Sequence, residues 1–214
     1  MRRRYLYLAI SAIVLIACGA LVANKLFLPP RSFQPDLVAR AETEMWKAYY
    51  GDDKTQLGLQ LVMLAHQQYM ISLAKAQEVA RLLASSAMDF RESEGEQEAK
   101  ALPQLEQAYR LIREASELDF DPEEAARNEL EWWVARRTPG RDSPEQVGRE
   151  IAELYATLYG SEPERYLEAG TLRARAGAVR DAGGKNADWQ QVEALLQQSY
   201  RKLEEALESR AESR

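Results

Sequence analysis

Three side chains on one predicted helix are the sharpest candidates for chemistry in this sequence. Met63, His66 and Met70 follow one another at three and seven residues from the first, which places them on one helix face. Thioether sulfur and imidazole nitrogen are ligands for copper(I) or a haem iron, so this face is a candidate metal or haem site. The same residues also suit an apolar helix, where Met fills gaps and a lone His is hydrogen-bonded. We therefore expect no cofactor, with this site as the alternative.

A second candidate lies where one predicted helix ends and the next begins. Arg136, Arg137 and Arg141 surround the loop before Ser143, the predicted first residue of a helix. Guanidinium groups and the free N–H groups of a helix start bind phosphate or carboxylate, so this cluster is a candidate partner-binding site. The structural explanation is that basic side chains favour the last turn of a helix, where they complement its dipole.

The sequence lacks a recognisable catalytic motif. It contains one His, so a Ser-His or Cys-His arrangement would rest on His66 alone. The run from Gly183 to Lys185 lacks the first glycine and the hydroxyl residue of a phosphate-binding loop, and it is typical of a helix end. Carboxylates are abundant, but nothing in their spacing selects a catalytic pair. We expect a protein that is not an enzyme, with an envelope hydrolase that uses carboxylates as an alternative.

Two adjacent tryptophans bear on partner binding. Trp132 and Trp133 point about 100° apart on a helix, so they cannot both face one core. Trp133 shares the predicted inward side with Leu130 and Val134, whereas Trp132 lies nearer Arg136. Either a second element covers Trp132, or its ring is exposed as an anchor for a protein partner.

The N-terminal stretch predicts where these candidates are held. Residues 5–23 carry no charge, and that length matches the roughly 30 Å hydrocarbon core of a bilayer. Residues 2–4 are all Arg, so the positive-inside rule places the N-terminus in the cytoplasm and the following chain in the periplasm or outside the cell. Residues 1–28 are therefore predicted to be a transmembrane signal-anchor in the cell inner membrane, with a single pass.

A lipoprotein signal is the alternative interpretation of the same stretch. The run from Leu15 to Cys18 resembles the bacterial lipobox, in which the cysteine becomes lipidated. The apolar residues that follow Cys18 depart from that pattern. Both interpretations place the rest of the chain on the outer side of the membrane.

The remaining chain predicts an all-α protein. A long helix is expected from Thr55 to Arg91, and its first half is apolar on nearly every side, which is typical of a buried central helix. Beyond it, Asp121, Ser143 and Asp188 are predicted helix caps, and Gly160 a helix end. Short loops favour antiparallel neighbours in a soluble bundle of about six to seven helices. The predicted segments are an anchor (1–28), a Pro-rich spacer (29–35), membrane-proximal helices (36–92), an acidic linker or helix end (93–100), a C-terminal bundle (101–210) and a frayed tail (211–214).

Charge and cysteine content narrow the function further. The net charge of −6 does not favour a nucleic-acid binder, and the one cysteine, in the anchor, excludes disulfides elsewhere. We expect a membrane-anchored, outward-facing and non-catalytic module that binds or assembles another envelope protein. The alternatives are the metal or haem site and the hydrolase described above.

Overall fold

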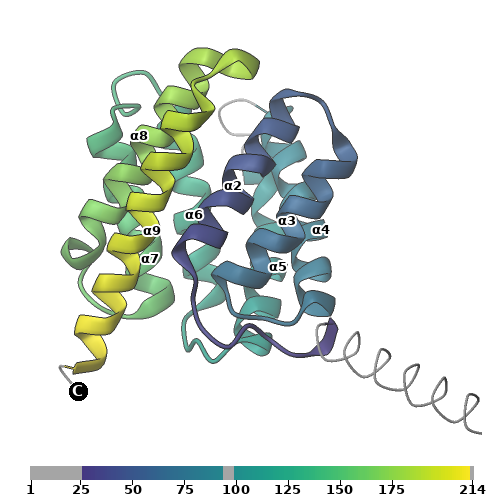
Figure 1. The fold of residues 1–214 in the computed structure, drawn as a ribbon, viewed down its shortest axis with the longest axis vertical. Coiled ribbons are helices and arrows are strands. Elements are labelled where there is room, and N and C mark those ends of the chain that lie inside the picture. Colours follow the sequence, from purple (N-terminus) through teal and green to yellow (C-terminus); the bar gives the residue numbers. More distant parts are fainter. Residues whose placement is uncertain (1–25, 94–98, 213–214) are drawn as a thin grey trace, which may run out of the picture.

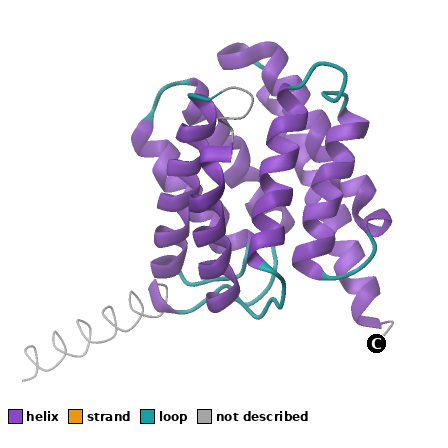
Figure 2. Cartoon of the chain, turned by 180° about the vertical axis from the view of Figure 1, so that it is seen from behind, coloured by secondary structure: helices purple, strands orange, loops and turns teal. Residues whose placement is uncertain are grey.

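A computed structural model describes residues 26–93 and 99–212 of the chain. Every regular element in this part is helical, which confirms the all-α prediction (Figures 1 and 2). The α-helices are α2 (Pro35–Tyr50), α3 (Lys54–Gln68), α4 (Leu73–Arg91), α5 (Leu102–Ala115), α6 (Pro122–Arg137), α7 (Pro144–Tyr159), α8 (Leu167–Gly183) and α9 (Trp189–Glu212). The short 3₁₀ turns η2 (Pro163–Tyr166) and η3 (Gly184–Asn186) flank α8.

The helices form a closed ring. Each α-helix packs against the next one in the chain, and α9 packs against α2. Successive helices run in opposite directions, so α2, α4, α6 and α8 all end at the same end of the ring (Figure 1). One hydrophobic core contains residues from both predicted halves, among them Val38 in α2, Leu105 in α5 and Leu203 in α9. The helix ring therefore holds segments 36–92 and 101–210 around one interior.

Local capping chemistry fixes several helix ends where the sequence predicts them. Asp121 Oδ1 accepts hydrogen bonds from the backbone N–H groups at the start of α6, and Ser143 Oγ does the same for α7. Asp188 Oδ1 accepts from Gln191 N at 3.0 Å at the start of α9. Gly160 ends α7 with φ of +65°, a backbone angle that favours glycine.

The predicted helix from Thr55 to Arg91 is wrong, because the chain turns between α3 and α4. Met70 adopts φ of +55°, and Ser72 Oγ accepts a hydrogen bond from Lys75 N to cap α4. Tyr69 and Ile71 are buried on either side of Met70. Burial of these two side chains and the Ser72 cap outweigh helix propensity, although residues 69–72 contain neither Gly nor Pro.

The role expected for α3 is also wrong. It is not a buried central helix, since Leu59 and Met63 are exposed on its outer side. Leu57 and Leu61 are half-buried and line an internal cavity. The helix is apolar on most sides because one side lines the cavity and another faces solvent.

The contact between α7 and α8 is unusually close. A Cβ atom built on Gly170 would overlap the carbonyl oxygen of Gly148, and one on Gly148 would lie 2.6 Å from Thr171 Cα. Only glycine permits the two backbones to approach in this way. The close approach fixes α8, and with it the side chains that α8 directs into the ring.

The predicted signal-anchor (1–28), which includes Cys18, lies outside the described part except for residues 26–28. Within residues 26–93 and 99–212, no helix combines the length and apolar character that crossing a bilayer requires. Residues 94–98, in the predicted acidic linker, are likewise outside this part. The helix α9 continues to Glu212, so the chain stays helical beyond the charged residues Glu204 and Glu205.

Candidate functional site

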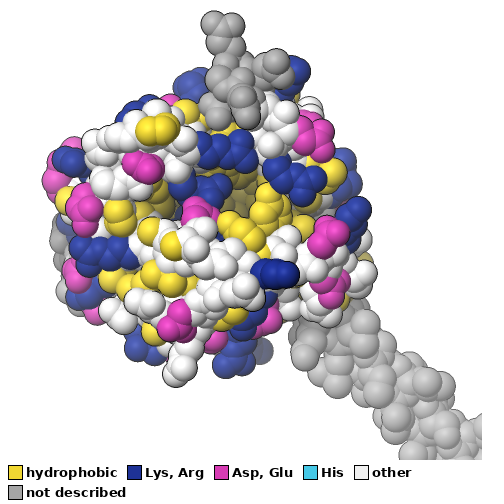
Figure 3. Space-filling model, turned by 90° about the horizontal axis from the view of Figure 1, so that it is seen from above, with side chains coloured by type: hydrophobic (Ala, Val, Ile, Leu, Met, Phe, Trp, Pro, Cys, Tyr) yellow, Lys and Arg dark blue, Asp and Glu magenta, His cyan; other side chains and the backbone are white. Residues whose placement is uncertain are grey.

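A cavity of about 490 Å³ lies inside the helix ring, between α2, α3, α4, α6 and α8. It is at the end where α2, α4, α6 and α8 finish. Figure 3 looks onto this end and shows a hollow with hydrophobic side chains inside it and basic side chains around it. Tyr49 and Met88 line the cavity and are 39% and 56% exposed, so solvent reaches it.

The wall from α3 and α4 is aliphatic. Its large side chains point into the cavity. They are Leu57, Leu61 and Leu64 from α3, and Leu83, Ala84, Ala87 and Met88 from α4. This wall offers mainly apolar surface to a bound molecule, and Gln68 and Arg91 are the polar side chains that α3 and α4 add to the lining.

The facing wall combines aromatic rings with guanidinium groups. Arg180 Cζ lies 4.1 Å from the centre of the Trp46 ring, and Arg173 Cζ lies 5.2 Å from the Trp132 ring. Arg137 Cζ lies 3.8 Å from the Phe90 ring. In such cation–π contacts the face of the aromatic ring attracts the guanidinium charge, so the arginines are stabilised beside apolar surface.

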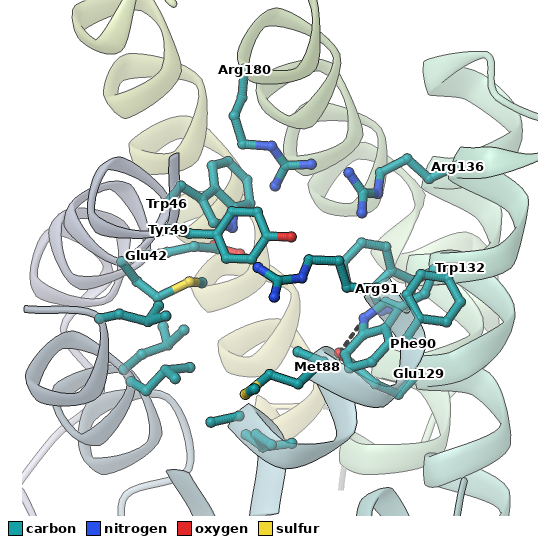
Figure 4. Close-up of a pocket in the computed structure, with 18 of the residues that line it drawn as sticks. Glu42, Trp46, Tyr49, Met88, Phe90, Arg91, Glu129, Trp132, Arg136 and Arg180 are labelled. Atoms are coloured by element: carbon teal, nitrogen blue, oxygen red, sulfur yellow. Dashed lines mark hydrogen bonds between the residues drawn. The ribbon is translucent and has the colours of Figure 1, made fainter. Parts of the chain in front are cut away.

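The ring topology explains why arginines gather here. Arg91, Arg136, Arg137 and Arg180 occupy the last turns of α4, α6 and α8, where a positive charge complements the helix dipole. Because the even-numbered helices end together, these last turns meet around one cavity. Figure 4 shows Arg136 and Arg180 reaching toward its middle from two sides. Local helix chemistry therefore assembles a basic site.

A buried charged network forms the inner part of this site. Glu42, fully buried on α2, accepts hydrogen bonds from Arg173 Nε at 3.0 Å and Nη2 at 2.7 Å. Tyr200 Oη donates to the second oxygen of Glu42 at 2.6 Å. Burial opposes the charge on Arg173, but Glu42 and nearby tyrosines outweigh it, and the pKa of Arg173 lies well above its usual value. The pair joins α2 to α8 across the ring.

A second acidic group sits at the mouth. Asp181 accepts from Arg180 at 2.8 Å, from Arg136 at 2.8 Å and from Tyr50 at 2.7 Å. Burial disfavours its charge, but the hydrogen bond and the charge of Arg180 outweigh that effect and lower the pKa of Asp181 to about 2. This carboxylate is therefore ionised at neutral pH and held by three donors.

The third carboxylate of the cavity is Glu129 on α6. It accepts from Tyr109 Oη and from Trp133 Nε1, each at 2.9 Å. Burial, followed by the nearby charge of Glu129, raises the pKa of Tyr109 well above its usual value. The side chains that line the cavity carry five guanidinium groups against three carboxylates, so the site is basic.

Three N–H donors in this wall lack an acceptor. They are Trp132 Nε1, Arg136 Nε and Arg173 Nη1, all buried at the atom. Arg173 also lies within hydrogen-bonding reach of the Tyr155 hydroxyl, which is likewise buried. A buried donor without an acceptor costs stability, and a bound water or ion can supply the missing acceptor.

The structure corrects the predicted orientation of the two tryptophans. Trp132 is the buried one, at 9% exposed, and Trp133 is half-buried with its N–H on Glu129. The buried residues of α6 include Ala125, Ala126, Glu129 and Trp132, while Leu130 and Trp133 are half-buried against the core. Sequence analysis misses this because it assigns the charged Glu129 to the surface. Of the two alternatives for Trp132, a ring covered by another part of the protein and a ring exposed to a partner, the structure shows the first.

The predicted arginine cluster is divided. Arg136 and Arg137 line the cavity. Arg141 does not; it pairs with Glu131 at 2.5 Å and with Glu150 at 3.1 Å on the outside of the ring. The structure therefore brings Arg136 and Arg137, but not Arg141, into the cavity lining.

The three residues of the candidate metal site lie in different surroundings. Met63 is exposed, and His66 Nδ1 donates to the Ile71 carbonyl at 2.6 Å, which fixes the ring against the turn. Met70 lies beyond the end of α3, in that turn. The described residues also contain no cluster of three or more His, Cys, Asp or Glu side chains arranged for a metal ion.

Sequence analysis does not find Glu42, Arg173 and Arg180. A weak signal exists, because Arg173 and Arg180 share one helix face with the small residues Gly170 and Gly177. Small residues on that face indicate close packing, which is unusual around surface arginines. The partner Glu42 is 131 residues away from Arg173, so no local pattern joins them.

No protein-family model matches the chain, and no curated protein or solved structure is significantly similar to it.

Proposed function

We propose that the protein is a receptor for a small molecule with an apolar body, which it binds in the cavity at the end of the helix ring. The observation that carries this proposal is the cavity itself. Its volume of about 490 Å³ falls within the roughly 300–1,000 Å³ of small-molecule pockets. Its mostly apolar walls with a few polar groups are typical of such pockets.

Binding without catalysis fits the state of the acidic groups. Glu42 is held by Arg173 and Tyr200, and Asp181 by Arg136, Arg180 and Tyr50. A general acid or base needs a proton that moves near neutral pH, whereas the pKa of Asp181 is lowered to about 2. A glycosidase-like pair also belongs in an acidic cleft, and this cavity is basic.

The predicted signal-anchor suggests where this receptor works. The chain enters the ring at Pro35, at the opposite end from the mouth lined by Tyr49 and Met88 (Figure 1). With residues 1–28 in the inner membrane, the mouth would face away from the bilayer into the periplasm or the exterior. A phosphatase fused after Arg214 should then be active; activity of a cytoplasmic reporter at that position would contradict this location.

The binding proposal is tested with the full-length protein in phosphatidylcholine nanodiscs. All four tryptophans are replaced by 5-fluorotryptophan, and dodecanol, a neutral apolar probe, is added. Trp46, Trp132 and Trp133 line the cavity and Trp189 does not, so the first three fluorine NMR signals should shift to saturation and the fourth much less. Assignment uses single Trp→Phe variants.

A filled cavity provides the control for this experiment. Ala87→Phe places a large ring in the aliphatic wall and should weaken dodecanol binding at least tenfold. The matched variant Ala194→Phe adds the same ring to the exposed side of α9 and should bind as the unaltered protein does. Equal shifts in both variants, or no saturable shift in the unaltered protein, would refute the proposed function.

A further inference from the structure

One polar side chain of the cavity lining takes no part in the networks around Glu42, Glu129 and Asp181. Gln68 is the last residue of α3, lines the cavity and is 5% exposed. Its carboxamide makes no hydrogen bond with any described residue, yet it is not among the polar groups that the protein covers completely. The amide group of Gln68 therefore faces the open space of the cavity.

Gln68 lies at the inner end of the cavity. Successive helices run in opposite directions, so α3 begins at the mouth and ends away from it (Figure 1). Four residues of α3 line the cavity at spacings of four, three and four, which places them on one helix face: Leu57, Leu61, Leu64 and Gln68. This face is about 16 Å long from the first residue to the last. Side chains of a helix lean toward its N-terminus, so the Gln68 side chain leans back toward the mouth and into the cavity.

The charges nearest this inner end include both signs. Glu42, Glu129 and Arg173 are the lining residues farthest from the mouth on α2, α6 and α8. Glu42 pairs with Arg173, and Glu129 accepts hydrogen bonds from two neighbours. The other four arginines of the lining lie in the last turns of α4, α6 and α8, at the mouth. An anionic group at the inner end would be repelled by the two carboxylates and an ammonium group by Arg173, whereas a neutral group meets neither repulsion.

We propose that the ligand is a neutral amphiphile, whose head group both donates and accepts a hydrogen bond and is bound by Gln68 at the inner end of the cavity. This assignment rests on the proposed function and names its substrate class. A carboxamide offers both donors and an acceptor, and a hydroxyl group can satisfy both kinds. The apolar chain of the ligand lies along Leu61 and Leu57 toward the mouth, where Met88 lines the other side.

The test compares two uncharged probes in the fluorine NMR experiment with the full-length protein. Dodecanol and tridecane have the same number of heavy atoms, and only dodecanol carries a hydrogen-bonding group. Their dissociation constants are followed on the Trp46 and Trp133 signals and corrected for partition of each probe into protein-free nanodiscs. Dodecanol should bind about fivefold more tightly than tridecane, the effect of one hydrogen bond between neutral groups.

Gln68→Met removes the carboxamide and keeps an unbranched side chain, so it should abolish the preference for dodecanol. The melting temperature should not fall, because the amide makes no hydrogen bond with the described protein. Gln67→Met is the matched control: Gln67 is also buried but does not line the cavity, so this variant should keep the preference. An unchanged preference in Gln68→Met would overturn the proposal. The comparison of the two probes in the unaltered protein tests it even if Gln68→Met does not fold.

Three further outcomes separate this proposal from its alternatives. Equal affinity for dodecanol and tridecane, with saturable shifts for both, would refute the head-group site while leaving small-molecule binding intact. Tighter binding of dodecanoate or of dodecylammonium than of dodecanol would show that the head group is charged, and would also overturn the proposal. No saturable shift with either uncharged probe would refute the proposed function itself.

Discussion

Two helix pairs lie on opposite sides of the ring, α7–α8 and α3–α4, and they pack in different ways. At Gly148 and Gly170 the α7 and α8 backbones touch, and no side chain separates them. In α3 and α4, large aliphatic side chains such as Leu61 and Met88 project into open space. The first pair fixes the position of Arg173, whereas the second can adjust its side chains to a bound molecule. Precise polar contacts and adaptable apolar contacts thus come from different sides.

The largest effect should come from breaking the buried ion pair that ties α8 to α2. Glu42→Gln keeps the shape of the side chain but leaves Arg173 charged, buried and without its counter-ion. Removal of one partner of a buried pair costs about 3–5 kcal/mol of unfolding free energy. Urea denaturation measures it. Glu145→Gln, which breaks the exposed pair with Arg175, is the matched control and should leave the unfolding midpoint nearly unchanged.

The same substitution on the two sides of the ring should have opposite effects. Gly170→Ala forces a methyl group into the α7 backbone and should destabilise the protein by about 1–3 kcal/mol. Gly58→Ala, in α3, meets no atom within 4 Å and should stabilise it by about 0.5–1 kcal/mol through helix propensity. Thermal melts of both variants and of the unaltered protein measure these two changes in stability. Destabilisation by both would mean that α3 is packed as tightly as α8.

A smaller effect should appear in acid. The folded-state pKa of Asp181 is lowered to about 2, so its ion pairs stabilise the fold fully above the ordinary pKa near 4 and lose that contribution as the pH falls toward 2. With allowance for partial exposure, the contribution is about 1–2 kcal/mol. Melting temperatures measured from pH 5 to pH 2 should fall less steeply in Asp181→Asn. Parallel curves would show that Asp181 is not held by Arg180.

The sequence predicts those features of the fold that depend on residues close together in the chain. The caps at Asp121, Ser143 and Asp188 form because a side chain three residues or fewer away satisfies free backbone groups. The break at Met70 depends on where Tyr69 and Ile71 are buried, and this is a tertiary property.

The site was less predictable for the same reason. Arg136 and Arg137 were found because last-turn arginines follow a local rule, but the cavity that gives them a role depends on four helices ending together. Glu42 and Arg173 join segments far apart in the chain, and each alone is typical of a solvated helix face. The sequence favours the wrong side for Trp132 because a charged residue, Glu129, shares its buried face.

The most direct measurement is a crystal structure of the protein grown with 12-bromododecanol, located by the anomalous scattering of bromine. The account predicts one strong bromine peak inside the cavity lined by Leu57, Leu61 and Met88. A peak on the outer face of α3 beside Leu59 and Met63, or a cavity that contains only water at saturating ligand, would contradict it.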